Sequence, residues 1–169
     1  VGNSGSPLLN LQGEVVGLVA DVIGGPAGIG GIGVAVPGDL VAQSIADLER
    51  FGVPQRGWLG ASLISLDELP PVLLRAVGLT STQGAMVDRV EPGSPAARAG
   101  LKGAQRDTQG RLLALGDVIL AVDGVAVKDK ADVVRLVAQR RPGDRVRLTL
   151  WRDRRRREVT VVLMARPRE

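Results

Sequence analysis

Val90-Glu91-Pro92-Gly93-Ser94-Pro95-Ala96-Ala97-Arg98-Ala99-Gly100-Leu101 is the stretch from which the rest of this chain can be organised. Pro92-Gly93 predicts a turn, the small residues that follow predict one or two helical turns, and Gly100 predicts the end of that helix. An apolar run at 85–90 precedes this stretch, and another at 117–124 follows it after a polar segment. Both runs have the length of strands. The middle of the chain is therefore predicted as two strands joined through a short helix.

The segments on either side extend this α+β pattern. Residues 129–140 repeat apolar side chains at helical spacing, with Val133, Leu136 and Val137 on one face. Beyond a turn at Pro142-Gly143, alternating apolar residues on both sides of an arginine-rich turn predict a terminal β-hairpin. The other segments predicted in this part are a strand at 59–63 and a short helix or turn at 69–77.

Residues 1–50 are organised differently. Short apolar runs separated by turn residues predict strands at 8–9, 15–19 and 32–36. From Asp39, which is available as an N-cap, the period becomes helical until Gly52-Val53-Pro54. The predicted division is one unit at 1–50, a linker at 51–57 and a second unit at 58–167.

The composition excludes several classes of protein. The chain has 169 residues, and its 44% hydrophobic content is enough for a packed core. Its lack of cysteine excludes disulfides, thiolate catalysis and cysteine-based zinc sites, and no unbroken apolar run is long enough to span a bilayer. Glu14 and Asp21 have no acidic partner at metal-ligand spacing, so we predict no metal and no other cofactor.

Ser4 is the candidate nucleophile. In Gly2-Asn3-Ser4-Gly5 a tight loop could present the hydroxyl while backbone N–H groups converge on a carbonyl oxygen. Such a serine needs a histidine to accept its proton, and this chain contains none. We therefore expect the chain to be a fragment whose catalytic base lies upstream, and to be inactive by itself. Taken alone, the short motif is more simply a polar turn.

The net charge of +4 is unevenly placed, and the densest basic cluster is Arg152 with Arg154–Arg157. Such a cluster could bind phosphates, which keeps a nucleic-acid-binding domain as an alternative. The simpler interpretation is a solvated hairpin tip, because apolar alternation flanks it on both sides, and we predict no nucleic-acid partner. Asp117 and Asp123 stand at strand-end positions, where a structural role is favoured over a catalytic one.

The order of these motifs resembles a known family. Gly2-Asn3-Ser4-Gly5-Ser6-Pro7-Leu8, the strand at 13–17, and Gly30 to Pro37 with its helix resemble the C-terminal end of the protease domain in HtrA/Deg-type serine proteases. The remainder resembles the PDZ domain that follows it in that family. The markers are Trp58-Leu59-Gly60-Ala61, Val90 to Leu101, Gly116-Asp117-Val118-Ile119 and Val122-Asp123-Gly124. The resemblance implies a mainly β fold with α+β character, in which the C-terminal part of a trypsin-like β-barrel precedes a PDZ domain.

The resemblance also implies roles for residues of the first unit. Ser4 would be the nucleophile, and the N–H groups of Gly2 and Ser4 would form the oxyanion hole. Small apolar side chains would line the substrate pocket and accept a medium-sized aliphatic residue. They are Leu18, Val19, Ala20, Val34, Ala35 and Val36. Ser6 and the Val19-Ala20 pair depart from the glycine and the Asn-Thr pair usual in the family.

In the second unit, Trp58, Leu59, Gly60 and Ala61 correspond to the carboxylate-binding loop of a PDZ domain, whose N–H groups capture the end of a peptide. The helix at 129–140 would form the other wall of the groove. Val134 is our predicted groove contact from that helix, because it points away from the core stripe. The alternatives are an ordinary strand start for the tetrapeptide and a core position for the valine.

By resemblance, the chain belongs to an ATP-independent serine endopeptidase of protein quality control. Its barrel would cut unfolded or misfolded proteins, and its PDZ domain would bind peptide C-termini. The same resemblance implies homotrimers and a periplasmic or cell-envelope location. The alternative is a non-catalytic PDZ module with a vestigial piece of barrel. We expect residues 1–50 to be poorly ordered in isolation, because part of a barrel exposes apolar faces and strand edges.

Overall fold

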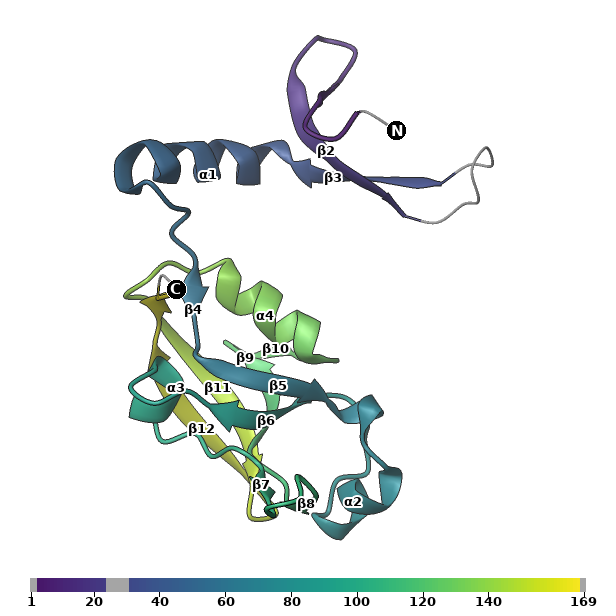
Figure 1. Ribbon diagram of the computed structural model, residues 1–169, viewed down its shortest axis with the longest axis vertical. Coiled ribbons are helices and arrows are strands. Elements are labelled where there is room, and N and C mark those ends of the chain that lie inside the picture. Colours follow the sequence, from purple (N-terminus) through teal and green to yellow (C-terminus); the bar gives the residue numbers. More distant parts are fainter. Residues whose placement is uncertain (1–2, 24–30, 168–169) are drawn as a thin grey trace. The chain divides into compact units, whose positions relative to one another are not determined.

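The computed structural model describes residues 3–23 and 31–167, and the chain divides into two units, Val1–Gln55 and Arg56–Glu169 (Figure 1). Each unit has its own β-sheet, and strands predominate over helices in both. Within the described ranges, no helix has the length and apolar character needed to cross a membrane.

A three-stranded antiparallel sheet and one helix form the first unit. Strands β1 (Pro7–Leu9), β2 (Val15–Ile23) and β3 (Ile32–Pro37) lie in that order, and α1 (Gly38–Phe51) follows β3 directly. The helix starts one residue before Asp39, so the predicted N-cap is wrong. The cap position is Pro37, and the Asp39 carboxylate instead accepts a hydrogen bond from the N–H of its neighbour Leu40.

The first unit has almost no core of its own. All buried apolar side chains of the described residues lie at Leu59 or later in the chain. The sheet and helix of the first unit instead expose large apolar side chains, among them Leu8, Leu9, Val15, Ile32 and Ile45. Since a sheet is stable only when its apolar face is covered, this unit has the surface expected of one part of a larger barrel.

The second unit is built around an antiparallel sheet with strand order β12-β11-β9-β6-β5, to which β10 is added beside β9. The strands are β5 (Ala61–Ser65), β6 (Ala85–Val90), β9 (Val118–Val122), β10 (Val125–Ala126), β11 (Arg145–Arg152) and β12 (Arg155–Val162). Two small pairs accompany this sheet, β4 (Gly57–Trp58) with β13 (Met164–Ala165) and β7 (Gln105–Arg106) with β8 (Leu112–Ala114). The helical elements are η1 (Leu66–Glu68), α2 (Pro71–Ala76), α3 (Pro95–Arg98) and α4 (Lys130–Ala138).

Apolar side chains of α4 and of the sheet form the core of this unit. Val133 and Val137 of α4 are buried with Ile119, Leu148 and other strand residues, as the helical stripe predicted. The alternating residues of β11 and β12 are buried on the same side, which confirms the terminal hairpin. The sheet therefore has one face packed under α4 and α3, and its edge strand β5 lies beside α4 (Figure 1).

The predicted strand at 59–63 is interrupted. Strand β4 ends at Trp58 and β5 begins only at Ala61, because Gly60 has a φ of 73°, which is incompatible with a strand. Leu59 and Gly60 form a loop between the two strands. The apolar run predicted a strand through this point because side-chain hydropathy does not reveal a left-handed glycine.

Candidate peptide-binding groove and serine loop

The loop at Leu59 and Gly60 presents backbone donors that are unused within the described chain. The carbonyl oxygen of Leu59 accepts a hydrogen bond from the Ala96 N–H at 2.9 Å, and that of Gly60 accepts one from the Glu91 N–H, also at 2.9 Å. The N–H groups of Leu59 and Gly60 donate to no other residue that the structure describes. Two adjacent free N–H groups on a fixed loop form a concave anion site.

The stretch that begins at Val90 holds this loop in place. Ser94 caps α3 by accepting a hydrogen bond from the Ala97 N–H at 3.2 Å, which orients the first turn of the helix. The N–H of Ala96 in that turn donates to the Leu59 carbonyl, and the N–H of Glu91, which directly follows β6, donates to the Gly60 carbonyl. These two hydrogen bonds fix the carbonyl groups of Leu59 and Gly60, and the N–H groups of the same residues remain available to a ligand.

A groove of about 220 Å³ runs from this loop between β5 and α4. Most of its lining is apolar and comes from the loop, from alternate residues of β5 and from one side of α4. The lining residues are Arg56, Gly57, Trp58, Leu59, Gly60, Ala61, Leu63, Val133, Val134, Val137, Ala138 and Arg166. Because β5 is an edge strand of the main sheet, its outer backbone groups can pair with an added strand.

Polar contacts at the start of α4 fix the width of the groove. The N–H of Lys130 donates to the Ser65 hydroxyl at 3.1 Å, and its ammonium lies 2.8 Å from the Glu68 carboxylate. The hydrogen bond from the Lys130 ammonium to the Glu68 carboxylate lowers the pKa of Glu68 below its usual value. Asp129 caps the helix by accepting from the Asp132 N–H. The helix that forms one wall is therefore anchored to the end of the strand that forms the other.

The predicted peptide-binding residues lie around this one groove. The structure brings Trp58 to Ala61 and Val134 together, and Val134 is 60% exposed although its neighbour Val133 is 1% exposed. Leu63, Ala138, Arg56 and Arg166 are among the lining residues that were missed. The first two could have been found, because Leu63 follows Ala61 by two residues on a strand and Ala138 follows Val134 by four on a helix. The two arginines carry no such signal.

The predicted nucleophile lies on a turn that is tied to β2. The Ser6 N–H donates to the Asn3 carbonyl at 3.0 Å, the Gly5 N–H to the Val19 carbonyl at 2.7 Å, and the Val19 N–H to the Ser6 carbonyl at 2.9 Å. Ser4 is exposed at the apex, and neither its hydroxyl nor its N–H bonds to another described residue. Gly2, the other predicted oxyanion residue, lies outside the described residues.

The six predicted substrate-pocket residues lie on two adjacent strands. Leu18 pairs with Val36 and Val19 with Ala35, and the register shifts at Ala20 before Asp21 pairs with Val34. Because the serine turn is bonded to Val19, the turn and this strand pair form one local unit. Among the described residues, the non-glycine residues with positive φ do not include Ser6, so a serine fits this position without backbone strain.

The PDZ domain family matches residues 57–163, which is more than half of the chain. The chain belongs to the PDZ domain family. Over 168 residues it is 33% identical to a protein of Brucella suis biovar 1 (strain 1330) named probable periplasmic serine endoprotease DegP-like, covering 99% of this chain and 30% of that protein. A protein of the same name from Halomonas elongata is 37% identical over 163 residues, or 96% of this chain and 31% of the relative. The chain thus spans about 30% of the length of these curated relatives.

Solved structures agree with this assignment. The HtrA-type protease AlgW with a decapeptide has a TM-score of 0.69 and 31% identity, and the match covers 99% of this chain and 47% of that one. A serine endoprotease from Yersinia pestis has a TM-score of 0.60 and 26% identity, with coverage of 98% and 48%. The predicted fold class and the resemblance to HtrA/Deg-type proteases, which the first unit shares, are therefore confirmed.

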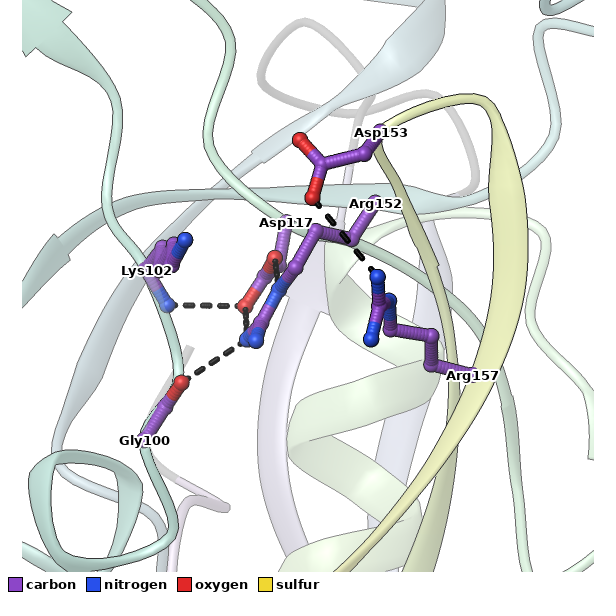
Figure 2. Close-up of polar contacts among 6 residues, drawn as sticks. All are labelled: Gly100, Lys102, Asp117, Arg152, Asp153 and Arg157. Carbon is purple, nitrogen blue, oxygen red and sulfur yellow. Dashed lines mark hydrogen bonds and ion pairs between the residues drawn. The ribbon is translucent and has the colours of Figure 1, made fainter.

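Two aspartates at strand ends of the PDZ domain have structural partners. Asp117 is buried and binds Arg152 and the Lys102 N–H (Figure 2). Asp123 accepts hydrogen bonds from the Arg147 N–H and the Arg140 guanidinium, both at 2.8 Å. These contacts support the structural role expected of both residues. In the part of the chain that the structure describes, no three acidic residues gather where they could hold a metal ion.

We predict that Gly60→Ala destabilises the PDZ domain and weakens peptide binding. The added Cβ would collide with the Ser94 side chain and lie 2.9 Å from the Trp58 ring, at a backbone φ of 73°. We expect a loss of about 2 kcal/mol in the free energy of unfolding, measured by urea denaturation. Gly93→Ala is the control, because Gly93 has a φ of 72° but no atom near an added Cβ. Equal losses in both variants would contradict the role of close packing at Gly60.

Proposed function

We propose that the PDZ domain binds the C-terminal carboxylates of peptides in the groove between β5 and α4. The observation that carries this proposal is the pair of free N–H groups on Leu59 and Gly60 at the end of an apolar groove. The N–H groups bind the terminal carboxylate, and the peptide pairs with the open edge of β5. Alternate side chains of an added strand face the same side, so the last residue and the one two before it point into the groove.

The lining of the groove defines the peptides that it favours. Leu63, Val133, Val137 and Ala138 offer no charge to an inserted side chain, and a volume of about 220 Å³ suits small or medium aliphatic residues. Val134 is exposed beside this site and covers the second inserted side chain. The preferred ligands are therefore C-terminal segments of proteins whose last residues are aliphatic.

We predict that a free C-terminus is required for binding. A polyalanine peptide that ends in valine with a free carboxylate is expected to bind at least about 10-fold more tightly than the same peptide with a C-terminal amide. The amide loses charge-assisted hydrogen bonds that are worth about 1.5–3 kcal/mol each. Fluorescence of Trp58, which lines the groove, reports the binding.

A variant of the helix wall separates groove binding from adsorption to other surfaces. Val134→Lys is expected to weaken binding of the free-acid peptide, and Val162→Lys serves as the control because Val162 is an exposed valine of β12 outside the groove lining. Equal affinity for the acid and the amide would contradict carboxylate capture. Equal effects of the two lysine variants would contradict the location of the groove.

We further propose that the chain is part of a periplasmic serine endopeptidase in which Ser4 attacks the peptide bond. Homology along 99% of the chain to proteins named as such endoproteases supports this, as does the exposed Ser4 on its tethered turn. The free N–H of Ser4 can donate to the oxyanion as negative charge develops on the attacked carbonyl. The proposed pocket residues on the paired strands β2 and β3 are apolar and offer no charge to the substrate.

The base that accepts the proton of Ser4 must come from residues outside this chain, since the chain has no histidine. The 169 residues alone are therefore proposed to be inactive in hydrolysis. Unfolded or misfolded proteins are the proposed substrates, and the PDZ domain binds their C-termini while the protease acts on exposed apolar segments. Homotrimer formation is proposed from the family resemblance. The alternative of a PDZ module that only binds peptides predicts the same groove and no activity at Ser4.

A further inference from the structure

The turn between β11 and β12 holds the strongest concentration of charge in the chain. We call Arg152–Arg157 the arginine hairpin. It contains five arginines and one aspartate, a net charge of +4, which equals the net charge of the whole chain. The other residues are therefore neutral on balance. Residues 1–55 carry a net charge of −4, and the second unit outside the hairpin carries +4. The hairpin is therefore the densest part of a basic unit, and such a cluster attracts an anionic surface.

Most of this charge is not used by the fold. The guanidinium groups of Arg155 and Arg156 make no ion pair or hydrogen bond with another described residue. Arg157 lies 3.9 Å from Asp153, and both side chains are at least half exposed, so this contact neutralises little charge. Arg152 is paired with the buried Asp117 (Figure 2), and the Arg154 guanidinium donates a hydrogen bond to the Ala76 carbonyl at 2.8 Å.

The backbone conformation of the turn between β11 and β12 is unfavourable for an arginine. Arg152 pairs with Arg155, which leaves Asp153 and Arg154 as a two-residue turn with φ values of 52° and 59°. Such a turn favours glycine or asparagine, since a Cβ is strained at positive φ. Turn formation therefore does not explain the arginine at position 154. The guanidinium of Arg154 donates to the Ala76 carbonyl at 2.8 Å, which gives this side chain a structural role at a strained position. The charge that remains available to a ligand is therefore that of Arg155–Arg157.

A cavity of about 430 Å³ is lined by residues of the hairpin together with residues of β7 and β8. Its lining combines apolar residues with cations, among them Val77, Leu115, Lys102 and Arg154. Leu113 also lines it and is 68% exposed. The ammonium of Lys102 bonds to no other described residue. An apolar floor with cations at its rim is complementary to a molecule that has an anionic head and an apolar body.

We propose that the arginine hairpin and Lys102 form a docking surface for anionic phospholipid headgroups at a membrane surface. Exposed arginines bind lipid phosphates by charge attraction and hydrogen bonds, and Leu113 can enter the boundary between headgroups and acyl chains. The choice of a membrane over a nucleic acid rests on the proposed periplasmic location. The chain also has only one Phe, two Trp and no Tyr, and the indole N–H of Trp151 donates to the Val77 carbonyl, so stacking platforms for bases are scarce.

The docking surface is separate from the peptide groove. No residue lines both the cavity beside the hairpin and the groove between β5 and α4. Both belong to the same compact unit, so a domain bound to lipid through the hairpin keeps its groove open to peptides. Docking would hold the groove near a membrane surface, where the C-termini of unfolded envelope proteins are presented.

The test is co-sedimentation of the 169-residue chain with lipid vesicles. Vesicles of phosphatidylcholine alone are compared with vesicles in which about a third of the lipid is phosphatidylglycerol. The double variant Arg155→Gln/Arg156→Gln is expected to bind the anionic vesicles about 30-fold more weakly, from about 1 kcal/mol for each arginine. The control Arg141→Gln/Arg145→Gln removes the same charge roughly 20 Å away, near the other end of β11, and is expected to retain most of the binding.

Two results would overturn the proposal. Equal weakening in both double variants would show attraction by net charge without a docking surface. Tight binding of a DNA duplex by a chain that does not bind the anionic vesicles would assign the hairpin to nucleic acid. Peptide affinity, measured in the same variants with the valine-ending peptide, is expected to be unchanged. The lipid result and the groove result can therefore fail independently.

Discussion

Replacing Ser4 by alanine in the proposed serine endopeptidase is expected to lower kcat for peptide hydrolysis by about 10⁶-fold. The variant loses the hydroxyl that we propose forms the acyl-enzyme, while the turn that carries it is held by backbone bonds to Val19, which alanine retains. KM is expected to change little, because the proposed substrate pocket on β2 and β3 is unaltered. Initial rates with an unfolded protein substrate, measured beside the wild-type enzyme, give the comparison.

Ser6→Ala is the matched control for Ser4→Ala. Ser6 lies in the same turn and contributes its backbone N–H and carbonyl, which alanine retains. Its activity is expected to stay within a few-fold of wild type. Activity that survives Ser4→Ala would mean that another residue is the nucleophile. A longer protein with no hydrolysis in its wild-type form would instead favour the alternative of a non-catalytic PDZ module.

Periodicity predicted most helices and strands here because the packing is regular. The stripe on α4 and the alternation on β11 and β12 each follow from a single buried face, which hydropathy reports directly. The hydropathy pattern does not reveal the backbone φ angle of a single residue. The strand predicted at 59–63 was interrupted at Gly60, and the predicted cap at Asp39 was displaced by the earlier start of α1.

Only part of the peptide groove could be predicted from the sequence. Its loop could be predicted because Trp58-Leu59-Gly60-Ala61 is continuous in sequence. Arg56 and Arg166 could not, since they meet at the groove only because β4 pairs with β13. Neither arginine bonds to another described residue. A contact between residues so far apart in the chain follows from the completed fold, and no local pattern contains it.

The partner of Asp117 is another such long-range contact, and it carries a large predicted effect. Arg152→Met is expected to lower the free energy of unfolding by about 3–5 kcal/mol, because it leaves a buried carboxylate without its cation. The side chain of Asp117 is 1% exposed, and both of its oxygens lie 2.6 Å from guanidinium nitrogens of Arg152. The Asp117 carboxylate raises the pKa of Arg152, so the guanidinium stays charged. Urea denaturation followed by circular dichroism measures the loss.

The pairing is tested by a second substitution. The double variant Asp117→Asn/Arg152→Met is expected to be more stable than Arg152→Met alone, because it removes the uncompensated buried charge. In the wild-type domain the Lys102 N–H donates to the Asp117 carboxylate at 2.7 Å (Figure 2), and the amide oxygen of asparagine can still accept this hydrogen bond. Arg147→Met on the same strand is the control. Arg147 lies 3.8 Å from Glu158 and both side chains are more than half exposed, so a change within about 0.5 kcal/mol is expected. If Arg147→Met and Arg152→Met were equally destabilising, the loss would reflect the removal of any arginine from β11, and the buried pair would not be what joins the hairpin to β9.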